Sequence, residues 1–255
     1  MKPFNHFHTL AIQRKGGEKN LQKLLTPITA LEQLAQKPDS YYLEWMTRCI
    51  FNAGFYWGVI TKKWPDFKEA FLDFDIETLL FQDEDFWINL CNDTRIVRHR
   101  KKIAAVRANL SLIADIRLEY GSFANWIAQW PSSDQAGLLW ELKKRGSRLG
   151  GRTGQYFLRF TGKDSFILSP DMALALRHAG LDIAEEPSSK RDMTIIQNHL
   201  NTWHTETGLS YTHMSKILAY SCGTNNDTEV IVKESGKWEG KNEPISYKKT
   251  DTFMR

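Results

Sequence analysis

The stretch LKKRGSRLGGRTGQYFLRFTGKDSFILSPDMALALRHAGL, residues 142–181, carries the pattern that decides the fold. Its first part predicts a helix, a tight turn at Gly150-Gly151 and a second helix beginning near Arg152-Thr153. Glycine permits left-handed backbone angles and lets a turn approach another surface closely. The free N–H groups at the start of the second helix predict a clamp for phosphate groups, flanked by Lys143, Lys144, Arg148 and Arg152.

The same stretch ends in a second signal, a helix start at Ser169-Pro170-Asp171. Serine caps the helix, proline takes its first position, and the aspartate faces the positive end of the helix dipole. Asp171 lies twenty residues beyond Gly151 (171 − 151), after the second helix and a short apolar link at 165–168. A lone aspartate of this kind usually only stabilises the helix dipole.

Apolar periodicity outside this stretch predicts helices almost throughout, so the expected class is all-α. The apolar run 40–62 is expected to end near Trp64-Pro65, because proline stops a helix. Residues 97–119 predict one long amphipathic helix that Gly121 ends. The other expected helices span residues 28–36, 65–72, 76–80, 83–92, 122–130, 134–145, 152–160, 191–206 and 210–221.

The charge distribution indicates a polyanionic partner. The chain has 255 residues and a net charge of +4, while residues 223–255 hold six basic and six acidic side chains. The surplus therefore lies in the body, where Lys and Arg gather in two clusters. Solvated helix faces are the alternative explanation. The clusters are Arg95, Arg98, Arg100, Lys101, Lys102 and Arg107, and then Lys143, Lys144, Arg145, Arg148 and Arg152.

The cysteines and the apolar segments exclude several classes of protein. Three cysteines without a CxxC pair indicate reduced thiols and cannot supply a four-cysteine iron–sulfur cluster. No apolar run reaches the length of a membrane helix, and the first residues lack a signal peptide's apolar core. The histidines show no metal-ligand spacing. We therefore expect no metal, no cofactor and no membrane partner, and a cytoplasmic location, nucleoid-associated in a bacterium or nuclear in a eukaryote.

The hairpin and the spaced aspartate resemble the helix-hairpin-helix (HhH-GPD) DNA glycosylase superfamily. In that superfamily an essential aspartate follows the hairpin at this distance and starts a helix that faces it. The resemblance covers residues 138–182 and implies a two-lobed helical bundle with the active site in the cleft between the lobes. It assigns Asp171 to catalysis, and Gly150, Gly151, Arg152, Thr153 and Arg148 to the DNA backbone. Leu149-Gly150-Gly151 stands where the superfamily commonly has Pro-Gly-hydrophobic-Gly.

Three further segments, in the same order, resemble the 3-methyladenine DNA glycosylase I family: 53–57 (AGFYW), 96–103 (IVRHRKKI) and 142–146 (LKKRG). That resemblance implies a base pocket walled by Phe51, Asn52, Tyr56 and Trp57, with Phe55 as the wedge that fills the vacated base stack. It adds Arg98, Arg100 and Lys101 to the residues that hold the DNA backbone. Plain core packing is the alternative for each aromatic. Cys49 stands where that family has a pocket glutamate, and its Cys/His zinc site has no counterpart.

These features together predict a DNA repair enzyme of base excision repair. It would flip a damaged base, an alkylated purine by resemblance, out of double-stranded DNA and hydrolyse its N-glycosidic bond as a monomer. Superfamily members that also cut the strand carry a lysine two residues after the last hairpin glycine, where this chain has Thr153, so a monofunctional enzyme is expected. A non-catalytic helix-hairpin-helix DNA-binding module is the alternative.

The domain organisation follows from the same motifs. We expect residues 1–38 to form an N-terminal extension and residues 39–222 to form the glycosylase domain, with the hairpin at about 138–160 and both termini contributing to the second lobe. Residues 223–255 are rich in Asn, Thr, Lys, Glu and Gly, which indicates a flexible polar tail.

Overall fold

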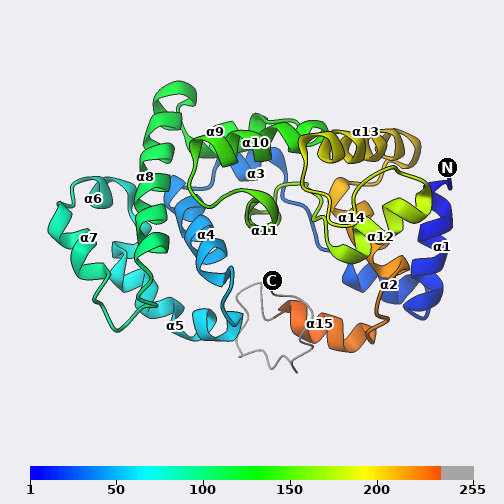
Figure 1. Ribbon diagram of the computed structural model, residues 1–255, viewed down its shortest axis with the longest axis horizontal. Coiled ribbons are helices and arrows are strands. Elements are labelled where there is room, and N and C mark those ends of the chain that lie inside the picture. The colour runs from blue at the N-terminus through cyan, green and yellow to red at the C-terminus, as the bar shows by residue number, and fades with distance from the viewer. Residues whose placement is uncertain (237–255) are drawn as a thin grey trace.

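The computed structural model describes residues 1–236, with side chains through residue 232 (Figure 1). The predicted all-α class is confirmed, since no strand occurs in this range. The elements are α1 (Phe4–Arg14), α2 (Glu18–Leu24), α3 (Leu31–Ala35), α4 (Asp39–Asn52), α5 (Trp57–Ala70), η1 (Leu72–Phe74), α6 (Ile76–Leu80), α7 (Glu84–Leu90), α8 (Arg100–Tyr120), α9 (Phe123–Gln129), η2 (Ser132–Asp134), α10 (Gln135–Arg145), α11 (Gly151–Thr161), α12 (Pro170–Ala179), α13 (Lys190–Thr207), α14 (Tyr211–Ser221) and α15 (Thr228–Gly236).

Two hydrophobic cores divide these helices into two lobes. The first lobe, α3–α11, closes around side chains such as Phe67, Ile113 and Phe157, all fully buried. The second lobe, α1, α2 and α12–α14, closes around Leu176 and Met214. Figure 1 shows α11 between the two groups of helices, with α4 on one side and α12 on the other. The hairpin helix therefore stands where the lobes meet.

Short polar side chains start many of these helices by accepting a hydrogen bond from the first turn. Ser169 accepts from the Met172 N–H, as its sequence predicts, and α12 begins there with Pro170 and Asp171. The same capping bond fixes the start of α6, α7, α8, α9, α10, α13 and α14 through Asp75, Asp83, His99, Ser122, Asp134, Ser189 and Ser210.

The run 40–62, expected as one helix, is two helices separated by a reversal at residues 53–56. Ala53 is extended (ψ 116°) and Gly54 has φ +75°, a left-handed conformation that L side chains rarely adopt. The reversal lifts residues 53–56 out of the helix and presents them at the surface. This loop holds the predicted wedge.

Pro65, expected to end a helix, lies inside α5. The ring of Trp64 stacks on Phe67, with 5.2 Å between centroids, and on Phe74 at 5.8 Å. This aromatic packing holds the helix together past the proline, which removes one backbone hydrogen bond but not the buried contacts on either side.

The apolar link between α11 and α12 is extended, and side chains satisfy its backbone. Each N–H from residue 165 to residue 168 donates to a side-chain oxygen, so the segment needs no neighbouring strand. Those oxygens come from three helices, α10, α11 and α14, and fix where α12 starts relative to the hairpin. The four acceptors are Thr212 (3.0 Å), Gln135 (2.6 Å), Ser215 (3.0 Å) and Gln155 (2.7 Å).

Both chain ends, expected as an extension and a flexible tail, contribute to the second lobe. Phe4, Phe7 and Ala11 of α1 are buried in its core, and α1 packs along α14. After Gly223 the chain forms α15 and packs on α2. The predicted tail therefore includes a helix in contact with α2, and its flexibility stays a prediction; residues 237–255 lie outside the described residues.

Candidate functional site

The hairpin turn between α10 and α11 differs from the prediction in which residues take left-handed angles. Arg148 has φ +58° and Gly151 has φ +57°, whereas Gly150 is extended at φ −78°. A Cβ on Gly150 would lie 3.2 Å from Cγ of Lys143, so any larger residue here would have to shift the Lys143 side chain by a few tenths of an ångström. A non-glycine residue at positive φ is strained, and such strain gathers at binding sites. Here it directs Arg148 outward from the turn.

Buried contacts hold the turn in this conformation. Leu149 is fully buried in the first core, and a Cβ on Gly154 would lie 2.3 Å from its carbonyl oxygen. Asn109 of α8, also fully buried, donates from Nδ2 to the Ser147 carbonyl (3.0 Å) and accepts from the Ser147 N–H (2.7 Å). Asn109 was not predicted from the sequence. The one feature that could have indicated it is a polar residue on the buried face of an amphipathic helix.

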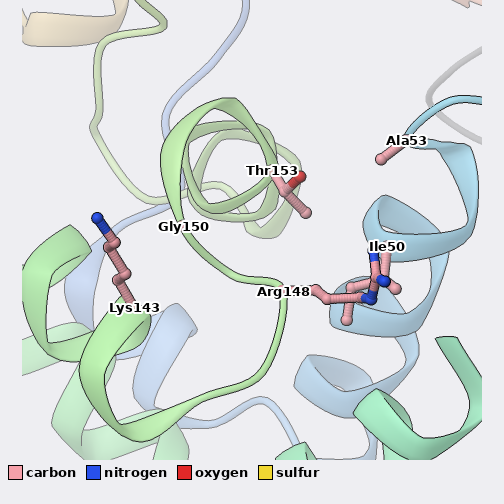
Figure 2. Close-up of a pocket in the computed structure, with 6 residues that line it drawn as sticks. All are labelled: Ile50, Ala53, Lys143, Arg148, Gly150 and Thr153. Atoms are coloured by element: carbon pink, nitrogen blue, oxygen red, sulfur yellow. The ribbon is translucent and has the colours of Figure 1, made fainter. Parts of the chain in front are cut away.

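A hollow of about 360 Å³ separates the hairpin from the end of α4. Figure 2 shows Arg148 reaching from the turn to Ile50, while Thr153 on α11 faces the opening toward Ala53. No side chain caps the start of α11, so its first N–H groups are left for an external acceptor. The predicted phosphate clamp therefore has its free donors and an opening beside them.

The two basic clusters separate into paired and unpaired cations. Arg95, Arg107 and Arg145 each form a short ion pair with an acidic side chain of the first lobe. Their charge is neutralised, which sequence alone did not reveal. The remaining predicted DNA-contacting cations are exposed and form no ion pair among residues 1–232; they are Arg98, Arg100, Lys101, Arg148 and Arg152.

The predicted wedge, Phe55, lies partly buried in the loop after α4. Its ring meets His99 edge-on, with 6.2 Å between centroids. Nζ of Lys102 lies 4.4 Å from the ring centroid and donates to the carbonyls of Phe51 (3.0 Å) and Ala53 (2.5 Å). Burial, assisted by the charge of Arg148, lowers the pKa of Lys102 to about 8. The sequence placed Lys102 in a cluster of surface cations, but its side chain is buried and bonds to the backbone around residues 51–53.

Aromatic side chains from α4, α5 and α11 meet beside this loop. Trp57 contacts Tyr156 edge-on, with 5.4 Å between centroids, and Phe160 at 6.2 Å. Phe160 also stacks on Trp45 at 5.3 Å. All four are partly buried. Trp57 was named as a pocket wall from sequence, but its three companions were missed, although Tyr156 and Phe160 share a helix face at i, i+4 spacing.

The other predicted pocket residues occupy different environments. Phe51 is fully buried and meets Phe67 edge-on, with 4.7 Å between centroids, so it belongs to the core and not to a pocket wall. The last turn of α4 turns this ring inward, away from the loop. Tyr56 is 44% exposed. Asn52 is 3% exposed, and its Oδ1 has no hydrogen-bond partner among the described residues, an uncommon state for a buried acceptor.

Asp171 occupies the second position of α12, partly buried. Burial raises the pKa of its carboxyl, and the Arg14 guanidinium opposes this by lowering it. Gly223 packs directly against the carboxylate: a Cβ on Gly223 would lie 1.9 Å from Oδ1. Arg14 and Gly223 come from the two chain ends, which sequence analysis kept outside the glycosylase domain.

Three further observations concern metal binding, membrane spanning and Cys49, the residue at the family's glutamate position. Among the described residues, no three His, Cys, Asp or Glu side chains gather as a metal site would need. Likewise, none of the described helices has the length and apolarity needed to cross a bilayer. Cys49 is buried, and burial raises the pKa of its thiol, so it is held as an uncharged thiol.

The first lobe is similar to known proteins. A solved structure titled as the crystal structure of 3-methyladenine DNA glycosylase I (TAG) is 25% identical, over 50% of this chain and 80% of that one, with a TM-score of 0.43. Residues 34–145, from α3 to the end of α10, match the family model described as methyladenine glycosylase. Over residues 34–145, therefore, the chain is similar to the methyladenine glycosylase family.

Proposed function

We propose that the chain is a monofunctional DNA glycosylase that flips an alkylated purine out of duplex DNA and hydrolyses its N-glycosidic bond. The observation that carries this proposal is the position of the family match. Residues 34–145 end where the hairpin turn begins, so the methyladenine glycosylase lobe continues directly into a helix-hairpin-helix clamp and then to Asp171.

The hairpin supports a grip on the DNA backbone. The uncapped N-terminus of α11 presents N–H groups, and the helix dipole favours a phosphate there. Arg148 and Arg152 are exposed beside it, and Arg98, Arg100 and Lys101 precede or begin α8. Contacts of this kind position a duplex without reading its sequence, as a repair enzyme that must act at any site requires.

Base flipping would use the loop at residues 53–56. Extruding a nucleotide costs a few kcal/mol, and an aromatic side chain that takes its place in the stack recovers part of that cost. Phe55 has the shape for this role, and Lys102 holds the loop that carries it. Because His99 and Lys102 already contact the Phe55 ring, insertion would require the ring to leave these contacts.

The aromatic cluster around Trp57 supports an alkylated purine as the flipped base. Electron-rich ring faces attract a positively charged base, by up to about 2 kcal/mol when water is excluded. Cys49 supplies no negative charge at the family's glutamate position, because burial keeps its thiol protonated. The rings are therefore the attractive element toward a cationic base, and the unpartnered Oδ1 of Asn52 offers an acceptor to the base edge.

Asp171 would act on the sugar. As the base departs with the bonding electrons, positive charge grows on C1′, and a nearby carboxylate stabilises it. Water then adds to C1′ and gives up a proton, which completes hydrolysis. A cationic alkylated purine leaves as a neutral base and needs no proton donor. Position 153 carries threonine, and the amine of Lys102 is buried against two carbonyls, so neither offers an accessible amine for strand cleavage.

Base release from methylated duplex DNA tests the proposal. The wild type should release a methylated purine, and Asp171→Asn should lose that activity while still binding DNA. Asp182→Asn is the matched control, because the Asp182 side chain is 93% exposed at the surface of the same lobe. If neither the wild type nor the control releases any base but both bind DNA with strong salt dependence, the chain is a non-catalytic binding module.

A further inference from the structure

Gly223 forms one wall of the space that the Asp171 carboxyl occupies. A methyl group in place of its hydrogen would lie 1.9 Å from Oδ1, 2.3 Å from Cγ and 2.8 Å from Oδ2 of Asp171. Real Cβ atoms do not approach so closely. Gly223 also has φ +64°, in the left-handed region. The left-handed conformation favours glycine here, and a side chain at this position would force the Asp171 carboxyl to move.

Arg14, at the end of α1, fixes the backbone that carries Gly223. Its Nε donates to the Tyr220 carbonyl (2.9 Å), and its Nη2 donates to the carbonyls of Cys222 (3.2 Å) and Gly223 (2.6 Å). These three bonds use the planar fork of a guanidinium, which lysine cannot reproduce. They hold the end of α14 and the following turn in one position.

The rest of this segment is tied to the same helix end. Nζ of Lys15 donates to Oδ1 of Asn225 (3.1 Å) and to the Asn226 carbonyl (2.9 Å). The α1 helix is itself anchored, because Phe4, Phe7 and Ala11 are buried with α14 in the second core. The wall beside Asp171 therefore rests on a packed helix and not on a free tail.

The positive charge of Arg14 also acts on this carboxyl. Its field lowers the pKa of Asp171 while burial raises it. Three titratable side chains near this segment make contacts of their own. Lys15 is bonded to residues 225 and 226, Sγ of Cys222 contacts Nδ1 of His178 at 3.8 Å, and Tyr220 faces the ammonium of Lys15.

We infer that Arg14 and Gly223 are positioning residues for Asp171, so that the two ends of the chain, both outside the family match at residues 34–145, complete the catalytic site. This inference rests on the proposed function. Gly223 limits where the carboxylate can lie, and Arg14 locks Gly223 in place and favours the ionised carboxylate. The tolerance is narrow, since a displacement of about 1 Å in a catalytic group can cost on the order of 100-fold in rate.

Two glycine variants separate positioning from folding. Gly223→Ala introduces a methyl group against Asp171, whereas Gly208→Ala introduces one at φ +69° with no atom within 4 Å. The backbone strain is therefore matched, and both variants should lose similar amounts of melting temperature. Gly223→Ala should also lower the single-turnover rate of base release on the order of 100-fold, with DNA binding unchanged, while Gly208→Ala keeps the wild-type rate. Equal rates for the two variants would overturn the inference.

Arg14 variants test the charge and the fork without adding bulk. In Arg14→Met the carboxyl loses its cation, so the pKa of Asp171 should rise and the acid limb of the rate profile should move to higher pH. Arg14→Lys keeps the positive charge but cannot make the three guanidinium hydrogen bonds. Relative to Arg14→Met, it should bring the pKa of Asp171 closer to the wild-type value than it brings the rate of base release. A merely structural role would change stability and leave the acid limb in place.

A carboxyl titration of Asp171 by NMR, in the wild type and Arg14→Met, separates the two possible failures. It needs no enzymatic activity. If the wild type releases no base, or Asp171→Asn releases it normally, the proposed catalytic role fails whatever Arg14 does. If base release depends on Asp171 but its pKa is the same in both proteins and Gly223→Ala behaves like Gly208→Ala, only the positioning inference fails.

Discussion

Asn109 on α8 satisfies both backbone groups of Ser147 in the hairpin turn, accepting from its N–H at 2.7 Å and donating to its carbonyl at 3.0 Å. The helix that carries much of the first core thereby also sets the shape of the hairpin turn, the predicted phosphate clamp. Arg148 follows Ser147 directly and holds its left-handed conformation next to this pair of bonds.

Asn109→Leu should therefore destabilise the protein by about 2–3 kcal/mol, because it leaves a buried N–H and a carbonyl without partners. Urea unfolding followed by circular dichroism would measure this loss. Ser111→Ala, on the exposed side of the same helix, should stay within about 0.5 kcal/mol of the wild type. If Asn109→Leu were as stable as Ser111→Ala, the turn would not depend on this contact.

The unpaired cations should control the salt dependence of DNA binding. Arg148→Gln and Lys101→Gln should each reduce the slope of log affinity against log salt by about 0.9, the contribution of one phosphate contact. Arg107→Gln is the control, since Arg107 already pairs with Glu84. Fluorescence anisotropy with an undamaged duplex at several salt concentrations would give the slopes. An equal change for all three variants would show that an ion pair within the protein does not keep Arg107 from contacting DNA.

Sequence alone predicted the elements that local rules determine. The cap at Ser169 with Pro170 behind it, the end of α8 at Gly121 and the hairpin with its glycines were all readable, because each depends on neighbouring residues. The class and the candidate carboxylate at Asp171 followed from these signals and from the resemblance they carry.

The remainder depends on contacts between residues far apart in the chain. Pro65 continues a helix because Trp64 is stacked on Phe67 and Phe74. Lys102 is buried, and its ammonium donates to one carbonyl in the last turn of α4 and to one in the loop that follows. Nothing local indicated that Arg14 and Gly223 would meet, 209 residues apart. Pairing of this kind is decided by tertiary packing, which periodicity does not encode.

Trp57 should matter for damaged bases and not for intact DNA. Trp57→Ala removes a ring face from the aromatic cluster, and loss of one stacking partner costs about 1–3 kcal/mol. KM for methylated duplex should rise by about 5- to 150-fold, while affinity for undamaged duplex stays the same. Trp57→Phe retains a ring against Tyr156 and Phe160 and should recover most of the loss. An equal loss of affinity for undamaged duplex would show that Trp57 only packs against its neighbours and does not contact the damaged base.

Lys102 should make stability depend on pH. Its pKa is about 8 in the folded protein and 10.5 as its ordinary value. Between these values the unfolded chain holds a proton that the folded protein has released, so the free energy of unfolding should rise with pH. Lys102→Met lacks this titration. Urea unfolding at pH 7.5 and pH 9.5 should show the wild type gaining on the variant, and a constant difference between them would contradict the lowered pKa.

The absence of a lysine at position 153 should decide whether the strand is cut. Thr153 faces the hollow between α11 and the end of α4, where a superfamily lysine would present its amine to C1′ (Figure 2). The wild type should give no covalent complex with damaged duplex DNA under borohydride, because no amine is free there to form a Schiff base. Thr153→Lys should give a trapped complex, visible as a shifted band on a denaturing gel. A trapped complex with the wild type would mean that another amine reaches the sugar, and Lys102→Met would then show whether the buried lysine is its source.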